Sequence, residues 1–279
     1  MLRNAFAYIT RKWPKSLLLF AIILLMGTLS LIGLSMKGAT QKASSESLGS
    51  ITNSFSMQIN RRTNPGTPRG AGNIRGEDIE KISQVEGITS SIKRINAIAD
   101  ILDHEIIETE ETLQNQSPER AKHFKNTLMV TGVNDSSKED KFVSGAYKLV
   151  QGEHLTDKDK NQILMHEDLA KKNGLKVGDK VRLKSNLYDA DNEKGANETV
   201  EVTIKGLFSG KNQAPLTYAQ ELYEDTLISD LDTAAKLYGN TVQTATYEDA
   251  TFFAKGDQDL DQLIEKIKAL DIPWNYYDL

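Results

Sequence analysis

The sequence predicts an α+β protein with one transmembrane helix near its N-terminus and an ectodomain built of two β-α-β pieces around a β-rich insert. Three observations predict this fold: an uncharged apolar run over residues 16–34, a strand-helix-strand pattern over residues 51–99, and a second such pattern over residues 250–276. Two β-α-β pieces commonly close on each other as a ferredoxin-like sheet. We therefore expect a split β-α-β subdomain interrupted by the insert.

The apolar run of nineteen residues, SLLLFAIILLMGTLSLIGL, has the length of a membrane-spanning helix. At about 1.5 Å per residue it matches the roughly 30 Å hydrocarbon core of a bilayer. Basic residues gather before it, whereas the first cations after it are Lys37 and Lys42. This bias predicts a cytoplasmic N-terminus, with everything from about Lys37 onward outside the membrane.

A cleaved signal peptide is the rival interpretation of this run. Its apolar core exceeds the roughly 7–15 residues of a signal peptide, and no convincing small-residue cleavage site lies between Leu34 and Ala43. These features favour an uncleaved anchor.

Composition excludes several classes of function. The 279 residues contain no cysteine, which rules out a disulfide framework, thiol chemistry and cysteine-ligated zinc. A net charge of −5 argues against a nucleic-acid partner, because binding to phosphates requires a basic face.

The predicted boundaries divide the chain into five parts. They are a cytoplasmic amphipathic segment (1–15), a transmembrane helix (16–36), a stalk (37–50), a β-α-β subdomain in two pieces (51–102 and 246–279) and the β-rich insert (103–245).

The first β-α-β piece is predicted from periodicity. Alternation over residues 51–59 indicates a strand, apolar residues on one face indicate a helix over 77–85, and a second strand follows over 88–99. Residues 60–76 are rich in Gly, Pro, Asn and Arg. Their arginines would suit an anionic surface, but the composition favours a solvated flexible loop.

The insert begins with an acidic stretch over 103–125, whose carboxylates we expect on a solvated face: Glu105, Glu108, Glu110 and Glu111. Short elements follow: strands at 128–133, 163–165 and 180–183, a helix at 167–172 ended by Gly174, and a polar loop at 186–197. Strict alternation over 200–208 predicts an antiparallel strand with one buried face.

The tail repeats the β-α-β pattern. A strand is predicted over 250–255, and an apolar stripe predicts a helix over 260–270. Alternation of Ile272, Trp274 and Tyr276 predicts a final strand.

No motif predicts a catalytic, cofactor-binding or metal-binding residue. The four histidines are His104, His123, His154 and His166, and only His166-Glu167 begins like a zinc motif, which fails because position 170 is Ala. A nucleophile elbow, a P-loop and a calcium loop are also absent from the sequence. A catalytic pair without a local motif stays open.

Several short segments carry a family resemblance through their order and spacing. They are the start LRNAFAYITRKWPKSLLLFAIILL, VEGI at 85–88, VTGV at 130–133, GEHL at 152–155, ILMHEDLAKKNGLKVGDKVRL at 163–183 and VTIKGLF at 202–208. Together they make nearly the whole chain similar to the N-terminal half of an FtsX/MacB-like ABC transporter permease.

The resemblance implies a fold and a setting. In that family the two β-α-β pieces form a porter-like subdomain of an extracytoplasmic domain on a bacterial cell membrane, and three further spans follow. Because this sequence stops at Leu279, near the end of the ectodomain, we expect it to be a fragment of a longer permease.

The resemblance also implies a mechanism and partners. The permease would couple ATP hydrolysis by a separate ABC-type ATPase to movements of the ectodomain, for export or handling of a peptide, antibiotic or lipophilic substrate. Its partners would be that ATPase, a second or related permease and membrane lipids, without nucleic acid or cofactor. The alternative is a membrane-anchored sensor or binding module that regulates an extracellular partner, such as a cell-wall hydrolase, without transport.

Overall fold

The computed structural model describes residues 14, 53–108, 114, 117–212, 222–256 and 258–279. The chain divides into two units, Met1–Thr52 and Asn53–Leu279, and every described residue except Pro14 belongs to the second. The predicted amphipathic segment, span and stalk therefore lie outside the described residues, apart from Pro14. Among the residues that are described, no helix is both long enough and apolar enough to cross a bilayer.

The second unit is a mixed sheet with short helices on it, which confirms the predicted α+β class. Its described residues form one ten-stranded sheet and a separate two-stranded one. The two-stranded sheet pairs β2 (Ile74–Arg75) with β10 (Thr246–Tyr247).

One end of the large sheet has ferredoxin-like topology. The strands run in the order β12 (Tyr277–Asp278), β1 (Ser54–Ile59), β11 (Asp249–Ala254) and β3 (Ile88–Leu102), and each neighbouring pair is antiparallel. Helix α3 (Gly76–Ser83) lies between β1 and β3 in the chain, and α9 (Leu260–Lys268) lies between β11 and β12. This is the strand order of a split β-α-β unit.

The other end is a closed cycle of six strands. From β3 the pairing passes through β4 (Thr127–Val133), β9 (Thr226–Asp230), β6 (Gln162–His166), β8 (Thr199–Ser209) and β7 (Lys180–Ser185) back to β3. Strand β5 (Lys148–Gly152) joins β8 outside the cycle. Short helices connect these strands: α5 (Pro118–His123), η1 (Ser136–Lys138), α6 (Asp140–Val143), α7 (Glu167–Lys172) and α8 (Leu231–Lys236).

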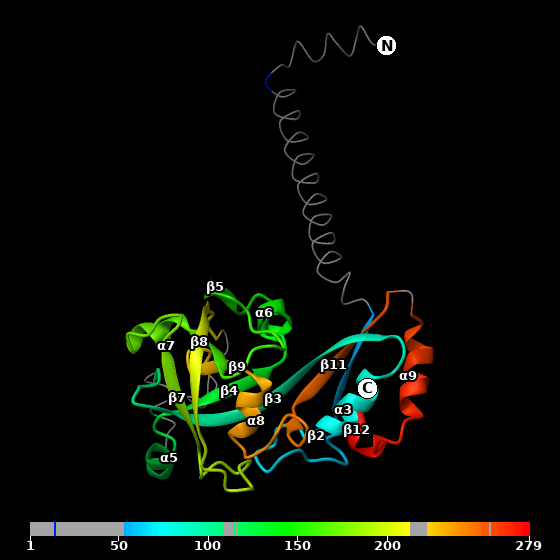
Figure 1. Ribbon diagram of the computed structural model, residues 1–279, viewed down its shortest axis with the longest axis horizontal. Coiled ribbons are helices and arrows are strands. Elements are labelled where there is room, and N and C mark those ends of the chain that lie inside the picture. Colours follow the sequence, from blue (N-terminus) through cyan, green and yellow to red (C-terminus); the bar gives the residue numbers. More distant parts are fainter. Residues whose placement is uncertain (1–13, 15–52, 109–113, 115–116, 213–221, 257) are drawn as a thin grey trace. The chain divides into compact units, whose positions relative to one another are not determined.

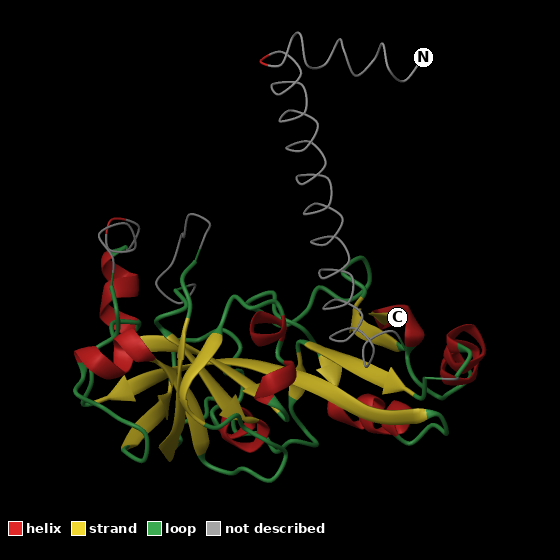
Figure 2. Ribbon diagram, turned by 90° about the horizontal axis from the view of Figure 1, so that it is seen from above, coloured by secondary structure: helices red, strands yellow, loops and turns green. Residues whose placement is uncertain are grey.

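Strand β3 belongs to both ends. Residues 88–94 pair with β11, residues 94–100 pair with β4, and residues 99–102 pair with β7. Fifteen extended residues span about 50 Å. Figures 1 and 2 show this strand running from the cycle into the ferredoxin-like sheet.

A continuous apolar core accompanies the strand. It includes side chains of both ends that are fully shielded from solvent, such as Met57 and Phe252 in the ferredoxin-like sheet and Leu183 and Leu227 in the cycle. Because protein interiors are close-packed, a continuous core resists relative motion of the parts it joins. The predicted division into a porter-like subdomain and an insert stays a prediction, since both parts share this sheet and core.

Several predicted elements are confirmed closely. Helix α7 has the predicted bounds, and Gly174 after it has a φ of 65°, as the predicted helix end requires. Strands β1, β3, β4, β6, β7, β8 and β11 lie where the sequence predicts strands.

Two predictions are wrong. The expected strand through Ile272, Trp274 and Tyr276 is mostly the 3₁₀ helix η3 (Trp274–Tyr276), followed by the two-residue β12. Pro273, at the N-cap of this helix, has no amide hydrogen to donate to a strand neighbour. Strand β8 is not purely antiparallel, because it pairs with β6 in parallel.

Helix α9 offers a direct test of the ferredoxin-like half. Leu263 and Ile267 are completely buried on its inner face. We expect Leu263→Asp to lower the free energy of unfolding by more than about 3 kcal/mol, because it buries a carboxylate among apolar side chains. Urea denaturation measures this loss. The matched control is Gln262→Asp on the exposed face, and equal stability of the two variants would contradict the placement of the helix.

Candidate functional site

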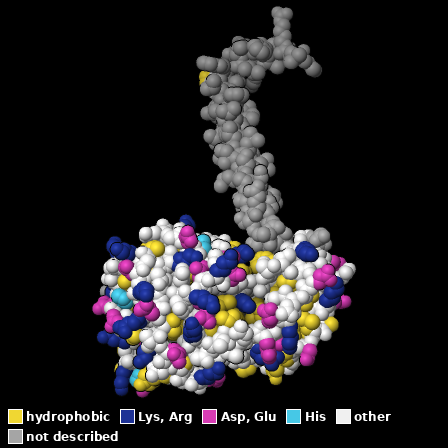
Figure 3. Space-filling view, viewed as in Figure 1, with side chains coloured by type: hydrophobic (Ala, Val, Ile, Leu, Met, Phe, Trp, Pro, Cys, Tyr) yellow, Lys and Arg dark blue, Asp and Glu magenta, His cyan; other side chains and the backbone are white. Residues whose placement is uncertain are grey.

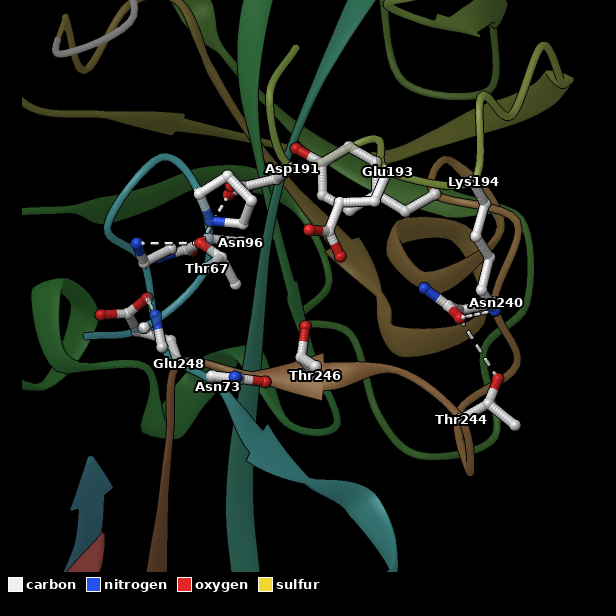
Figure 4. A pocket seen from close by; sticks show the side chains of 15 residues that line it. Thr67, Asn73, Asn96, Asp191, Glu193, Lys194, Asn240, Thr244, Thr246 and Glu248 are labelled. Carbon is white, nitrogen blue, oxygen red and sulfur yellow. Dashed lines mark hydrogen bonds between the residues drawn. The ribbon is translucent and has the colours of Figure 1, made fainter. Parts of the chain in front are cut away.

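A polar cavity lies beside the junction of the two ends of the sheet. Its volume is about 240 Å³, and it is bordered by the loop at residues 66–73, the connection at residues 191–194 and the segment at residues 238–248. The middle of β3 contributes Asn96 (Figure 4). On the face shown in Figure 3, basic and acidic side chains are interspersed over the described part. Because charges of both signs are mixed on this face, the cavity is a better candidate for a functional site than the charged surface.

An ion cluster around Arg69 lies against the cavity and contributes Asp191 to its lining. The guanidinium of Arg69 lies 3.3 Å from the carboxylate of Asp189 and 3.2 Å from that of Asp191. The two aspartate side chains are only 2% and 3% exposed. Two buried carboxylates thus share one cation, an arrangement that is stable only while the cation stays in place.

Tyr238 extends this cluster to the central strand. Its hydroxyl donates to Asp189, and it accepts hydrogen bonds from Arg69 at 3.2 Å and from the backbone amide of Ile98 in β3 at 3.0 Å. Burial raises the pKa of the Asp189 carboxyl and also the pKa of the Tyr238 phenol. The phenol therefore stays protonated at neutral pH and remains a donor to Asp189.

The loop on the other side of the cavity is held in a fixed conformation. The backbone amide of Arg69 donates to Asp191 at 2.6 Å, and the hydroxyl of Thr67 donates to the same carboxylate at 2.9 Å. Gly72 donates to Glu248 at 2.7 Å, and a Cβ at Gly72 would come within 2.3 Å of the Glu248 Cα atom. Only glycine allows this close approach.

The predicted loop at residues 60–76 is a loop as far as Asn73, and its second half is held by specific ion pairs. Arg69 is held between buried carboxylates, and Arg75 pairs with Asp78 at 2.8 Å. The charges of both arginines are already paired with carboxylates of the protein. Asp189, in the predicted polar loop at 186–197, is also buried. Its charge is balanced by Arg69, which lies more than a hundred residues earlier in the sequence.

The side chains that face the cavity are mostly neutral. Figure 4 shows Glu193 and Thr246 pointing toward each other across the space, with Asn73 on one side and Asn240 on the other. The amine of Lys194 donates to Asn240 at 2.6 Å. The lining thus combines amides and hydroxyls with the amine of Lys194 and the carboxylates of Asp191, Glu193 and Glu248.

A second ion cluster lies farther along β3, around Arg94. Its guanidinium binds Asp249 in β11 and lies 3.2 Å from Asp140 and 3.7 Å from Glu139 at the start of α6. Glu139 is 2% exposed and also caps α6 by accepting from the amides of Lys141 and Phe142. Arg94 therefore links the ferredoxin-like sheet to an element of the cycle.

The histidines lie in separate environments. His166 accepts from the amide of Asp168 at 3.1 Å through Nδ1, so its Nε2 carries the proton donated to the carbonyl of Gly210 at 2.8 Å. His154 bonds to Ser136, and His123 stacks on Tyr188. In the described ranges no group of three or more acidic or histidine side chains is placed to hold a metal. The prediction of no catalytic residue stays a prediction.

Asp225 is a buried carboxyl outside the cavity. It is 0% exposed, and it accepts from the backbone amide of Ile107 at 2.6 Å. Burial, with smaller contributions from the nearby carboxylates of Glu224 and Glu108, raises its pKa to about 8. The folded protein therefore holds a proton on Asp225 at neutral pH.

Comparison with known proteins finds a family match over most of the chain. A family model described as a MacB-like periplasmic core domain matches residues 16–270. The chain is 23% identical over 306 residues to the uncharacterized ABC transporter permease YclI of Bacillus subtilis (strain 168). This match covers 100% of the chain and 61% of YclI, so the chain spans less than two thirds of that relative.

Solved structures of similar proteins are also found. One is the periplasmic region of MacB from Actinobacillus actinomycetemcomitans, with 16% identity and a TM-score of 0.45 over 77% of this chain and 81% of that one. Another is the extracellular domain of the noncanonic ABC-type transporter YknZ from Gram-positive bacteria, with 12% identity and a TM-score of 0.42 over 81% of this chain and 98% of that one.

Removing the cation of the Arg69 cluster should destabilise the fold. We expect Arg69→Ala to lower the free energy of unfolding by about 3 kcal/mol, because Asp189 and Asp191 are left as uncompensated buried charges. Arg62→Ala is the matched control, since Arg62 is an exposed arginine of the same loop and should change stability by less than about 0.5 kcal/mol. Equal urea midpoints for the two variants would show that the Arg69 cluster contributes nothing to the stability of the fold.

The raised pKa of Asp225 predicts a pH dependence of stability. A folded pKa of about 8, against an ordinary value of 3.8, gives stability that is complete below pH 4 and is lost as the pH rises through 8. Asp225→Asn removes this titration while keeping the acceptor for Ile107.

Between those two pH values the stability of the wild type should therefore fall relative to that of Asp225→Asn, by about 1.4 kcal/mol per pH unit. Urea denaturation of both proteins at a series of pH values measures this. A constant difference would mean that Asp225 is already ionised in the folded state.

Proposed function

The chain belongs to the family of MacB-like periplasmic core domains, and from that premise we propose that it is the ectodomain-bearing part of a mechanotransmission permease. In this proposal a separate ABC-type ATPase hydrolyses ATP, and the permease converts the resulting movement at the membrane into a movement of the ectodomain. The family resemblance predicted from the sequence is confirmed by the match over residues 16–270. The same match is the observation that carries the proposal.

The chain covers only part of the length of YclI. The chain corresponds to 61% of that permease, so transport, substrate and partners belong to the proposal for the whole protein.

The junction between the two ends of the sheet suits mechanical transmission. Strand β3 runs through it without a break, and the clusters of Arg69 and Arg94 join elements on either side. A displacement applied to the ferredoxin-like sheet would therefore move the strands of the cycle as well. Such stiffness is what a lever requires, whereas a hinge would absorb the displacement.

The proposal includes a location and partners. Residues 16–36 would anchor the chain in a bacterial cell membrane, with residues 1–15 in the cytoplasm and the domain from residue 53 onward outside. The partners would be the ATPase, a second or related permease and membrane lipids. The cargo would be a peptide, antibiotic or lipophilic compound that the ectodomain exports or handles.

The polar cavity favours a second candidate function. A preformed hollow lined by hydrogen-bonding groups is a feature of a binding module. In this alternative the chain is a membrane-anchored sensor that recognises a ligand and regulates an extracellular partner, such as a cell-wall hydrolase, without transport.

Affinity purification from membranes tests the proposal. We expect an epitope-tagged chain, expressed from its own locus, to retain an ABC-type ATPase in comparable molar amount. A catalytically inactive ATPase should then give the same change in resistance to toxic compounds as deletion of residues 54–279. A matched control is the tagged chain carrying Gln262→Asp, which alters only an exposed side chain and should retain the ATPase.

Two results would contradict the permease proposal. One is the absence of any ATPase from the purified material together with retention of an extracellular enzyme. The other is unchanged efflux after the deletion. Together they would favour the sensor.

A further inference from the structure

We propose that the polar cavity is a binding site for one ring of a saccharide, a neutral ligand with several hydroxyl groups. The cavity is lined by both charged and neutral side chains, and their arrangement indicates the ligand. Asp191 and Glu248 have partners within the wall, and neutral hydrogen-bonding groups face the space together with the carboxylate of Glu193, which is unpaired among the described residues. The proposal does not depend on coupling to an ATPase.

Two of the three carboxylates in the lining already have partners within the protein. Asp191 is paired with Arg69 and also accepts from Thr67, and one oxygen of Glu248 accepts from the amide of Gly72. Lys194 donates to Asn240. The lining carries one cation, Lys194, against three carboxylates, those of Asp191, Glu193 and Glu248, which disfavours a phosphate. Among the described residues no group of acidic or histidine side chains is placed to hold a metal ion.

Four polar groups facing the cavity have unused hydrogen-bonding capacity. The side chains of Asn73, Glu193 and Thr246 make no hydrogen bond to the described residues, and Asn96 uses only its carbonyl oxygen, which accepts from Thr131 at 3.3 Å. Amides and hydroxyls both donate and accept hydrogen bonds. They thus match neighbouring hydroxyls of a sugar ring, each of which also donates and accepts, while the carboxylate adds a strong acceptor.

The volume fits a single ring. The cavity volume of about 240 Å³ lies just below the roughly 300–1,000 Å³ of pockets that hold drug-sized ligands. This is enough for one monosaccharide unit and too little for an extended peptide or a lipid chain. A longer saccharide would place its terminal ring in the cavity and its remaining rings in solvent.

The site is formed before any ligand arrives. The loop carrying Asn73 is held by the contacts of Arg69 and Gly72, and the strand carrying Thr246 is paired with β2. Asn96 lies in the middle of β3. A preorganised site loses little conformational entropy on binding, which raises the affinity for a small ligand.

Isothermal titration of the full 279-residue chain tests the proposal. The chain is kept in a detergent without a sugar headgroup, and the probes are methyl glycosides of glucose, galactose, mannose and N-acetylglucosamine. We expect at least one to bind saturably. Asn73→Ala and Glu193→Ala should each weaken that binding by about tenfold, since each removes a hydrogen-bonding partner of the ligand.

Matched controls use the same residue types outside the cavity. Asn275→Ala and Glu198→Ala alter exposed side chains and should leave the affinity unchanged. Thermal denaturation of all four variants checks that each remains folded at the titration temperature. A variant that unfolds is replaced by Thr246→Val, with Thr199→Val as its exposed control.

A second set of titrations distinguishes two possible ligands, a free monosaccharide and the terminal sugar of a polymer. Equal affinity for a methyl glycoside and for an oligosaccharide ending in the same sugar identifies a free monosaccharide ligand, and tighter binding of the oligosaccharide identifies the end of a polymer. Both outcomes support the site. The proposal is overturned if no glycoside or oligosaccharide binds, or if binding is unaffected by the cavity variants.

Discussion

The structure of residues 53–279 depends on the continuity of β3. A single strand pairs with β11 at its start, with β4 in its middle and with β7 at its end, so the ferredoxin-like sheet and the closed cycle share one backbone. The hydrogen bonds at its start hold it to β11, and those along the rest hold it to β4 and β7. The parts consequently behave as regions of one sheet, even though the chain leaves the ferredoxin-like topology after β3 and returns to it only at β11.

The two arginine clusters reinforce this shared strand at separate points. Arg94 connects β3 and β11 with the start of α6, and Arg69 connects the loop after β1 with the polar connection between β7 and β8. Through Tyr238 the second cluster also reaches the amide of Ile98. Each cluster buries carboxylates that need their cation, so separating the parts would expose an uncompensated charge. The polar cavity lies against the Arg69 cluster, where a bound ligand would contact segments from both ends of the sheet.

Local patterns in the sequence predicted most elements, because periodicity and helix ends depend on neighbouring residues. Helix α7, with Gly174 after it, and the alternating strand β8 are examples. Partners distant in sequence could not be predicted in this way. The parallel pairing of β8 with β6 and the closure of the cycle are properties of the whole chain. The candidate site could not be predicted for the same reason. Arg69 and Asp189 each lie in a polar, loop-like sequence, and neither sequence indicates that the two side chains will form an ion pair.

The distance between the two ends of the sheet tests the central claim most directly. The chain has no cysteine, so Gln262→Cys in α9 and Lys171→Cys in α7 provide two exposed sites for spin labels. Pulsed electron paramagnetic resonance then gives the distribution of label distances in frozen solution. A rigid shared strand predicts one narrow distribution, with a width set by the labels. A broad or two-peaked distribution would contradict the account, because it would mean that the ferredoxin-like sheet and the cycle move independently.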